Sequence, residues 1–365
     1  MKKIYLFLTV TAIMFAMSVN AKVWTVSNVH SAADFTTLQD AIDGATAGDT
    51  IYIEGSGASY GSGILAKKLV IIGTGYWLNE NDTTQVNKQH SQVGALTFNI
   101  GSEGSEIQGL YFTATSMGGS GGSIIRILTD TITIARNYFT YHAGFGSYNG
   151  AKEVIIFIGD RDKIIITQNW IEIDFVAGNL VYDQTVRGVL SSGTPTNCII
   201  SKNFIRSYQN GFNGAHVAIS TPYNSGTDVL VFNNVIWGDI TTYYTVHKNN
   251  ILVSGSYNSG YDSEVYNNIC NGTQYPVGNG NQQNVDMSTV FVDYVGYIDN
   301  DYFLASGSPA IGAGIGGGDC GAFGTYMGNP YILSGMPEIP AIFDATIGTF
   351  GTTVLPVNIK AISHH

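Results

Sequence analysis

Five segments of the chain share one pattern of apolar and polar positions: a short apolar run, an Asn, and a second apolar run. The intervals between successive Asn residues are 32, 34, 31 and 34 positions, for Asn137, Asn169, Asn203, Asn234 and Asn268. A period of this size, built from strand-like runs without helical periodicity, is typical of a solenoid in which each repeat forms one coil. Further strand-like runs precede the Asn units at residues 124–128, 154–158, 188–190, 216–220 and 251–254. The pattern therefore predicts about three strands per coil.

The recurring Asn has a structural interpretation. Neighbouring coils of a β-solenoid stack about 4.8 Å apart, which brings equivalent side chains within hydrogen-bond reach. An Asn at a tight bend between two strands can then bond to its counterpart one coil away. A buried amide without partners costs about 1–3 kcal/mol, so each Asn should be satisfied by the next. We expect a ladder of these five side chains and interpret them as structural rather than catalytic.

The two ends of the chain differ from the repeats. Residues 35–45 carry apolar side chains at helical spacing and lead into a strand at 50–53, which predicts a short N-terminal helix that caps the open end of the solenoid. A Gly- and Pro-containing break at 327–340 precedes an alternating, strand-like piece at 354–361. We therefore expect a solenoid over residues 22–325, and a linker with a short β appendage over residues 326–365.

Residues 1–21 have the features of an export signal: Lys2 and Lys3, an apolar run at 4–17, and small residues before Ala21. The apolar run is too short to cross a membrane, so we expect a secreted protein at the cell surface, outside the cell or in a periplasm, without membrane insertion. Removal of the two lysines changes the formal net charge from −11 to −13. This acidity argues against nucleic acid as a partner. We expect a monomer.

Cysteine chemistry adds little. The chain has three cysteines, an odd number without metal-ligand spacing. Cys198 and Cys270 occupy apolar positions of their repeats, so we expect them to pack in the core. The sequence indicates no metal site and no cofactor, although calcium stays open.

Two stretches resemble a known family. FTTLQDAI at residues 35–42, with AGDTI at 47–51, resembles the N-terminal cap and first coil of the pectate-lyase-like right-handed parallel β-helix superfamily. SPAIGAG at 308–314 and DCGAF at 319–323 are similar to the closing coils of many secreted bacterial β-helix proteins. The resemblance covers residues 33–325 and implies an all-β, right-handed parallel β-helix. It does not imply one activity, because the superfamily includes polysaccharide lyases, glycoside hydrolases, epimerases and adhesins.

Catalytic signatures of that superfamily are incomplete in this chain. The inverting pectin hydrolases use two adjacent aspartates, and this sequence contains no Asp-Asp pair. The alginate and chondroitin lyases carry a Lys on a strand whose counterpart here, residues 187–193, has none. If the protein is an enzyme, the resemblance leaves polysaccharide lyase and glycoside hydrolase as the two classes.

Aligning the repeats on their Asn residues indicates one candidate site. Positions three and five residues after the Asn should point outward, because strand side chains alternate between two faces. On three successive coils these positions hold Glu172 and Asp174, Arg206 and Tyr208, and Trp237 and Asp239. Aromatic rings beside carboxylates and a guanidinium suit the binding of a polysaccharide. The alternative is structural: Glu172 and Arg206 as a cross-strand ion pair, with Trp237 in a cation–π contact.

A second candidate site lies on the strands before the Asn units. Arg187 and His216 would lie there, with Asp160 in a nearby turn, and an Arg or a neutral His could remove the proton that lyase chemistry requires. Alternatively, residues 160–163 form an ordinary charged turn. Loops rich in Gly, Ser and Tyr at 55–63, 117–122, 141–150 and 256–261 would either wall a groove or simply connect coils.

Two functional hypotheses follow. The first is a secreted protein that binds an extracellular polysaccharide, with lyase-like cleavage as an extension. The second is a non-catalytic structural or adhesive protein of the cell surface or matrix.

Overall fold

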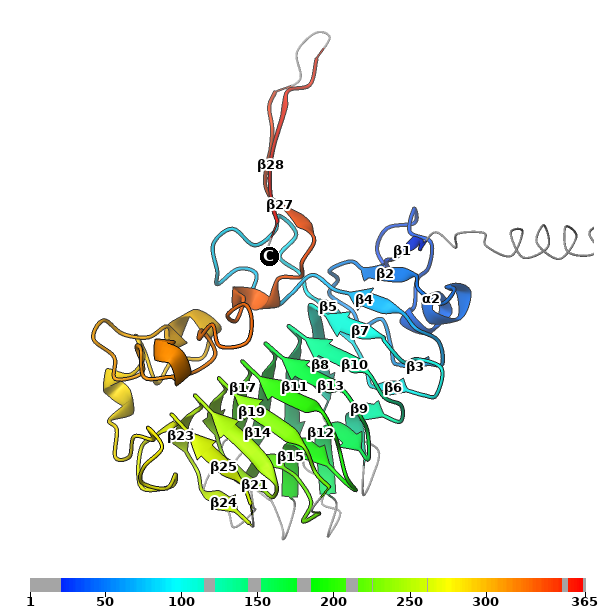
Figure 1. The fold of residues 1–365 in the computed structure, drawn as a ribbon. Helices are drawn as coiled ribbons and strands as arrows, with labels where there is room; N and C mark the ends of the chain where they lie inside the picture. Colours follow the sequence, from blue (N-terminus) through cyan, green and yellow to red (C-terminus); the bar gives the residue numbers. More distant parts are fainter. Residues whose placement is uncertain are drawn as a thin grey trace, which may run out of the picture.

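A computed structural model describes residues 21–114, 122–143, 152–175, 185–207, 216–224, 226–260, 262–349 and 354–363. The protein is mostly β, and its strands form three long parallel sheets that the chain visits in turn (Figure 1). This arrangement confirms the predicted all-β parallel solenoid. The predicted export signal lies outside the described residues, apart from Ala21. None of the helices in the described ranges is long and apolar enough to cross a membrane.

Sheet A has ten strands: β1 (Val23–Val26), β2 (Thr50–Ile53), β4 (Val70–Ile72), β7 (Glu106–Gln108), β10 (Ile132–Ala135), β13 (Ile164–Thr167), β16 (Cys198–Ser201), β19 (Val229–Phe232), β22 (Thr245–Lys248) and β25 (Glu264–Tyr266). Sheet B has eight: β3 (Gly63–Leu65), β6 (Leu96–Phe98), β9 (Ser123–Ile127), β12 (Lys152–Gly159), β15 (Thr185–Ser191), β18 (His216–Ser220), β21 (Asp239–Thr242) and β24 (Tyr257–Ser259). Sheet C also has eight: β5 (Ser91–Val93), β8 (Leu110–Ala114), β11 (Tyr138–Ala143), β14 (Trp170–Phe175), β17 (Phe204–Ser207), β20 (Val235–Trp237), β23 (Ile251–Ser254) and β26 (Ile269–Cys270).

The core lies between the three sheets and is mainly aliphatic. Equivalent side chains stack along sheet A, where the register pairs Ile134 with Ile166 and Ile200 with Val231, all at most 1% exposed. Each such side chain contributes about 1.5–3 kcal/mol by leaving water. The expected helix is α2 (Leu38–Gly44), whose Leu38, Ala41 and Ile42 are buried in this core. Cys198 and Cys270 also pack there, as predicted.

Six of the described coils turn from sheet A into sheet C over two residues. The first residue has a left-handed backbone with φ between 54° and 57°; we name this set the turn column, and it consists of Arg136, Gln168, Lys202, Asn233, Asn249 and Asn267. The second residue is the recurring Asn. Its Oδ1 accepts the backbone N–H and the Nδ2–H of the Asn in the preceding coil, at 2.8–3.1 Å. The predicted Asn ladder is therefore confirmed.

The ladder is longer than predicted. Asn250 lies between Asn234 and Asn268, and Asn281 continues the ladder beyond Asn268. The interval from Asn234 to Asn268, interpreted above as one repeat, thus contains two short coils. In consequence β23 lies in sheet C after its Asn, and the prediction that residues 251–254 precede an Asn unit is wrong.

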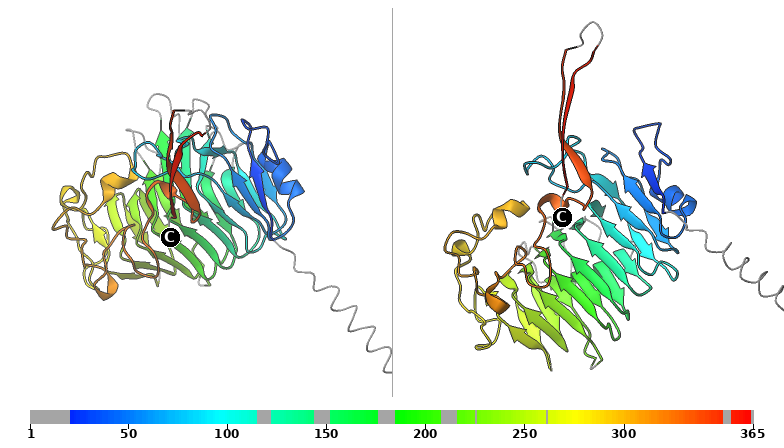
Figure 2. Two further views of the ribbon diagram at one scale, coloured as in Figure 1. Left: turned by 90° about the horizontal axis from the view of Figure 1, so that it is seen from above. Right: turned by 45° about the horizontal axis from the view of Figure 1, so that its top comes forward.

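After Cys270 the chain leaves the three sheets and returns along their outside. Four short 3-10 helices lie in this part: η1 (Met287–Thr289), η2 (Asp299–Tyr302), η3 (Ile315–Gly317) and η4 (Leu333–Gly335). Residues 313–338, which we call the return strap, follow the bend between sheets A and C (Figure 2). The predicted solenoid boundary at residue 325 therefore falls within the return strap, well beyond the last strand of the sheets.

Five of the six residues of the turn column hold the return strap. Asn267 donates to the Ala313 carbonyl, at 2.8 Å, and Gln168 accepts from the Ile332 N–H, at 3.0 Å. Between these two hydrogen bonds, Asn249 accepts from the Ile315 N–H, and Asn233 donates to the carbonyls of Asp319 and Gly321. At the far end Arg136 donates to the Met336 carbonyl and pairs with Glu338. One edge of the solenoid is thus clamped along most of its length.

The predicted β appendage is an antiparallel hairpin of β27 (Pro340–Ile347) and β28 (Val357–Ser363). It projects away from the sheets (Figure 1). Direct cross-strand partners share one face of a hairpin, so Ile347 with Val357 and Ala345 with Ile359 give it an apolar face. Ile347 is 69% exposed, so this face is largely uncovered.

Candidate functional site

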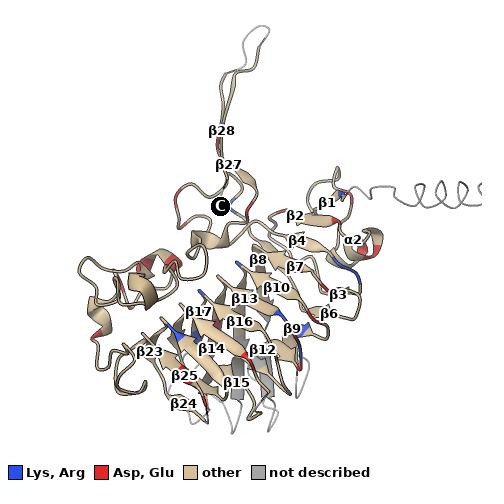
Figure 3. Ribbon diagram, viewed as in Figure 1, with Lys and Arg blue, Asp and Glu red and all other residues tan. Residues whose placement is uncertain are grey.

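The first predicted site lies on the outer face of sheet C. The register places Glu172 beside Arg206 and Arg206 beside Trp237, as the alignment predicts. However, Arg206 is only 3% exposed and Trp237 8% exposed, because residues 287–304 pack over them. The expected open platform is therefore mostly an internal layer between sheet C and the returning chain. Charged residues are sparse along the described ribbon as a whole (Figure 3).

Arg206 fixes that layer. Its guanidinium lies 5.0 Å from the ring centre of Trp237, 5.3 Å from that of Trp170 and 5.4 Å from that of Tyr302. It also donates to the Gly296 carbonyl, at 3.2 Å. Cation–π contacts of this kind contribute more when they are desolvated, up to about 2 kcal/mol. The structural alternative for Arg206 and Trp237 thus describes their geometry.

Glu172 belongs to the same layer. Its carboxylate accepts hydrogen bonds from Tyr138 Oη, at 2.8 Å, and from Trp170 Nε1, at 3.3 Å. Burial and the neighbouring Glu172 charge raise the pKa of Tyr138 far above its ordinary value, so this phenol remains a hydrogen-bond donor. Glu172 therefore anchors aromatic side chains of the covered face.

The outward column five residues after each Asn does not continue to Asp239. The chain turns at Gly238, which has φ 128°, and Asp239 begins β21 in sheet B, opposite Val217. Its Oδ1 accepts from the backbone N–H and hydroxyl of Ser256, at 2.8 and 2.7 Å. Asp174 lies in β14, but its side chain and the whole of Tyr208 lie outside the described residues.

The second predicted site is only partly described. Arg187 pairs with Val217 across β15 and β18, whereas His216 pairs with Val186, so the two occupy neighbouring positions of the ladder. The side chains of Arg187 and His216 lie outside the described residues. Asp160 is exposed and accepts two hydrogen bonds from Thr194, at 2.8 and 2.9 Å, which lower its pKa. Asp160 thus stabilises the turn between two coils.

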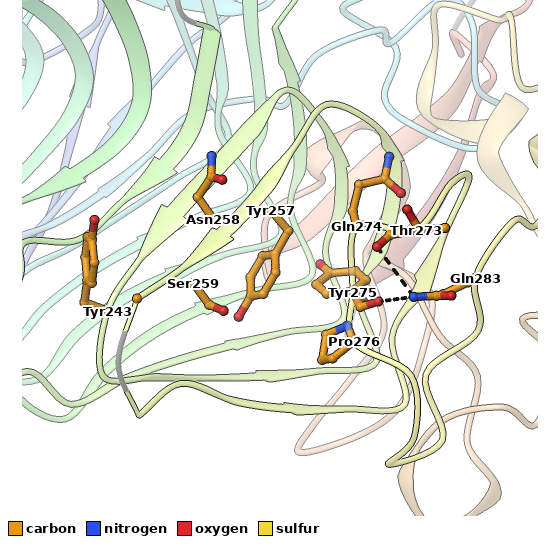
Figure 4. Close-up of a pocket in the computed structure, with 10 residues that line it drawn as sticks. Tyr243, Tyr257, Asn258, Ser259, Thr273, Gln274, Tyr275, Pro276 and Gln283 are labelled. Atoms are coloured by element: carbon orange, nitrogen blue, oxygen red, sulfur yellow. Dashed lines mark hydrogen bonds between the residues drawn. The ribbon is translucent and has the colours of Figure 1, made fainter.

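A cleft of about 410 Å³ opens at the end of the solenoid where β24 is the last strand of sheet B. We call it the tyrosine cleft; its lining includes Tyr243, Tyr257, Asn258, Ser259, Gln274 and Tyr275. Figure 4 shows Tyr257 and Tyr275 in the middle, with Tyr243 on one side and Gln274 on the other. One wall comes from the loop at 256–261, which the sequence marked as a possible groove wall. The wall at 273–276 was not predicted, because nothing in its composition distinguishes it from a plain connection.

The tyrosine cleft is firmly built. The rings of Tyr257 and Tyr275 lie 4.8 Å apart, and Tyr275 is fully buried. Gln283 donates to the Tyr275 carbonyl, at 2.5 Å. Gln274 accepts from the Gly272 N–H, at 2.9 Å, and donates to Asn271 Oδ1, at 2.7 Å. These contacts position the walls without a ligand.

The lining of the tyrosine cleft is uncharged. Tyrosine, Asn, Ser, Thr, Gln, Gly and Pro make up its described residues, and no Asp, Glu, His, Lys or Arg is among them. Burial raises the pKa of Tyr257 to about 12, so its phenol is neutral at physiological pH. The cleft therefore offers ring faces, hydroxyls and amides, but neither a general base nor a pair of carboxylates.

A second cleft, also of about 410 Å³, lies beside Trp237 at the end of sheet C. We call it the tryptophan cleft; besides Trp237, its lining includes Ser254, Asn271, Asp286 and Tyr294. The predicted residue Trp237 thus reaches a surface cleft even though most of its ring is buried. Within the described residues no group of three or more His, Cys, Asp or Glu side chains is arranged to hold a metal ion.

No protein-family model matches this chain, and a search of curated proteins finds no significant match.

Proposed function

We propose that the protein is a secreted, right-handed parallel β-helix, capped by α2, that binds a neutral extracellular glycan in the tyrosine cleft. The observation that supports this most is the lining: the half-buried rings of Tyr243 and Tyr257 lie beside uncharged hydroxyl and amide side chains, and the described lining contains no Asp, Glu, His, Lys or Arg. The C–H faces of sugar rings stack on aromatic rings, and sugar hydroxyls bond to amides and hydroxyls. A formal net charge of −11 also disfavours a polyanionic glycan.

The same lining favours binding over cleavage. Glycoside hydrolysis generally requires two carboxyl groups on either side of the scissile bond. Uronate lyases require a base within hydrogen-bond reach of the proton that is removed. The described lining of the tyrosine cleft offers neither, so we propose recognition without chemistry at this cleft. The lyase-like activity considered from the sequence would have to use Arg187 or His216 on sheet B.

The test is a binding and activity panel. The purified protein is incubated with neutral glucans, xylans, mannans and galactans and with uronate polymers, each with and without calcium. Retention is followed by affinity electrophoresis, and new reducing or unsaturated ends are followed in solution. We expect retention by at least one neutral glycan without new ends. New ends from any glycan would establish an enzyme, and no retention across the panel would refute the proposal.

A variant pair locates the site. Tyr243→Ala removes a half-buried ring from the cleft, and we expect it to weaken binding about tenfold, equivalent to about 1.4 kcal/mol. Tyr266→Ala is the control, because Tyr266 is also half-buried but lies on β25 in sheet A and does not line the cleft. Equal losses of affinity in both variants would place the binding site elsewhere.

One observation favours the non-catalytic structural or adhesive function. The hairpin of β27 and β28 leaves Ile347, Val357 and Ile359 more than half exposed on one face. Uncovered apolar surfaces of this kind often mark contacts with other macromolecules. A protein that binds glycan at one place and is attached through the hairpin at another would combine both functions.

A further inference from the structure

The tyrosine cleft and the tryptophan cleft share a wall. Asn271 lines the tryptophan cleft and Gln274 lines the tyrosine cleft, and the Gln274 side chain donates to Asn271 Oδ1, at 2.7 Å. Gln274 also donates to the carbonyl of Gly255, at 3.1 Å. Ser254, the residue before Gly255, lines the tryptophan cleft. The turn at 271–274 thus contributes a side chain to the lining of each cleft.

The tryptophan cleft has its own ring surfaces. Tyr294 is 42% exposed at the cleft. The remaining exposed part of Trp237 faces the same cleft, while Tyr302 packs against the Trp237 ring edge-on, at 5.0 Å between centres. Arg206 contacts the Trp237 ring as well, so the indole is held in place before any ligand binds. A fixed ring loses little conformational freedom on binding.

Polar groups of the tryptophan cleft resemble those of the tyrosine cleft, with one addition. Ser254 and Asn271 are exposed and offer a hydroxyl and an amide. Asp286 is exposed too, and hydrogen bonds from the side chain and backbone of Ser288 lower its pKa, so it is ionised at neutral pH. A carboxylate accepts hydrogen bonds strongly from hydroxyl groups. This cleft therefore suits a second hydroxylated ring.

We propose that the two clefts are subsites of one binding site, and that the ligand is a linear neutral oligosaccharide that crosses the turn at 271–274. This inference rests on the proposed function, since it assumes that the tyrosine cleft binds a glycan. Two linked subsites act on one chain with a high effective concentration, which raises the overall affinity about 10²–10⁴-fold without new contacts in either cleft. A ligand confined to one cleft gains nothing from the other.

The experiment is a chain-length series. Gluco-, xylo-, manno- and galacto-oligosaccharides from one to eight sugars are titrated into the full chain by isothermal calorimetry. We expect the affinity of one series to rise at least about 100-fold from the disaccharide to the longest members and then to level off. An affinity that stays constant beyond the shortest binding sugar would overturn the two-subsite proposal but leave the proposed function intact. No binding by any sugar in the series would overturn both.

Variants separate the two clefts. Tyr243→Ala should weaken binding of short and long sugars alike, whereas Tyr294→Ala should weaken only the long ones, by about tenfold. The control is Tyr297→Ala, because Tyr297 is 73% exposed on the same segment and lines neither cleft. Circular dichroism verifies that each variant is folded. If Tyr294→Ala and Tyr297→Ala bind the longest sugar equally, the tryptophan cleft is not a subsite.

Discussion

The Asn ladder is the interaction in this protein whose strength can be worked out most directly. Asn203 is fully buried, and its Oδ1 accepts from the backbone N–H and from Nδ2 of Asn169, at 2.8 and 3.0 Å. Its Nδ2 donates to the Ile166 carbonyl, at 2.9 Å, and to Asn234 Oδ1, at 3.0 Å. Replacement of Asn203 by Ala removes all four bonds at once.

The four losses are unequal. Asn234 Oδ1 still accepts from the backbone N–H of residue 203, at 3.0 Å, and Asn169 Nδ2 still donates to two carbonyls, at 2.8 and 3.0 Å. The backbone N–H of Asn169 is left without an acceptor, which costs about 1–3 kcal/mol. The Ile166 carbonyl loses a donor, and a small cavity remains. We expect Asn203→Ala to lower the free energy of unfolding by about 3 kcal/mol.

Urea unfolding followed by near-ultraviolet circular dichroism measures this loss. The matched control is Asn258→Ala, because Asn258 is exposed and its amide makes one bond, to Ser256, at 3.2 Å. We expect the control to change stability by less than about 0.5 kcal/mol. Asn203→Asp is a second test: the carboxylate retains both acceptor bonds but cannot donate to Ile166, so it should destabilise at least as much as Ala. If Asn203→Ala is no less stable than Asn258→Ala, the ladder does not hold the coils together.

Two further predictions concern the return strap and the buried His247. A chain that ends at residue 339 lacks only the projecting hairpin and should melt within about 3 °C of the full chain. A chain that ends at residue 312 also lacks the return strap and should melt at least about 10 °C lower or fail to fold. Equal melting temperatures of the two shortened chains would show that the strap is not a clamp. Burial lowers the pKa of His247 to about 3, below the value of about 6.5 in the unfolded chain. The stability that the neutral imidazole contributes is therefore present above pH 6.5 and is lost as the pH falls towards 3. The loss is at most about 1.4 kcal/mol per pH unit. His247→Gln should therefore flatten the fall in unfolding free energy between pH 6.5 and 4 relative to the wild type; parallel curves would contradict a buried neutral imidazole. Burial raises the pKa of Asp299 to about 6. Its effect on stability as the pH falls is therefore opposite to that of His247, and it is the same in the wild type and in His247→Gln.

The sequence predicts the solenoid and its ladder because both depend on local repetition. An Asn that recurs at a nearly constant interval between apolar runs leaves few alternatives to stacked coils. The same reasoning misses Asn250 and Asn281, because the last coils shorten to 16, 18 and 13 residues and no longer follow the period. Periodicity identifies coils of similar length and overlooks the short ones at the end.

The covering of sheet C depends on contacts between distant parts of the chain. Gln168 binds Ile332 across 164 positions, and Arg136 binds Met336 across 200. No spacing rule connects such pairs. One local signal was nevertheless present: the residue after every ladder Asn except Asn281 is apolar or aromatic, as in Tyr138, Trp170 and Phe204, although it lies on the outer face. A strand that is apolar on both faces predicts a sheet that is covered on both sides.

That covering also decides where a ligand can bind. The outer face of sheet C carries aromatic side chains, and residues 285–338 cover it with their own rings, so that Phe204 packs against Tyr302 and Tyr331. Aromatic side chains still line the tyrosine cleft and the tryptophan cleft at the last coils. Trp237 connects the two regions, because Arg206 contacts its ring beneath the covering segment and the same residue lines the tryptophan cleft. If the proposed function holds, the segment that covers sheet C also removes most of the aromatic side chains of that face from contact with a glycan.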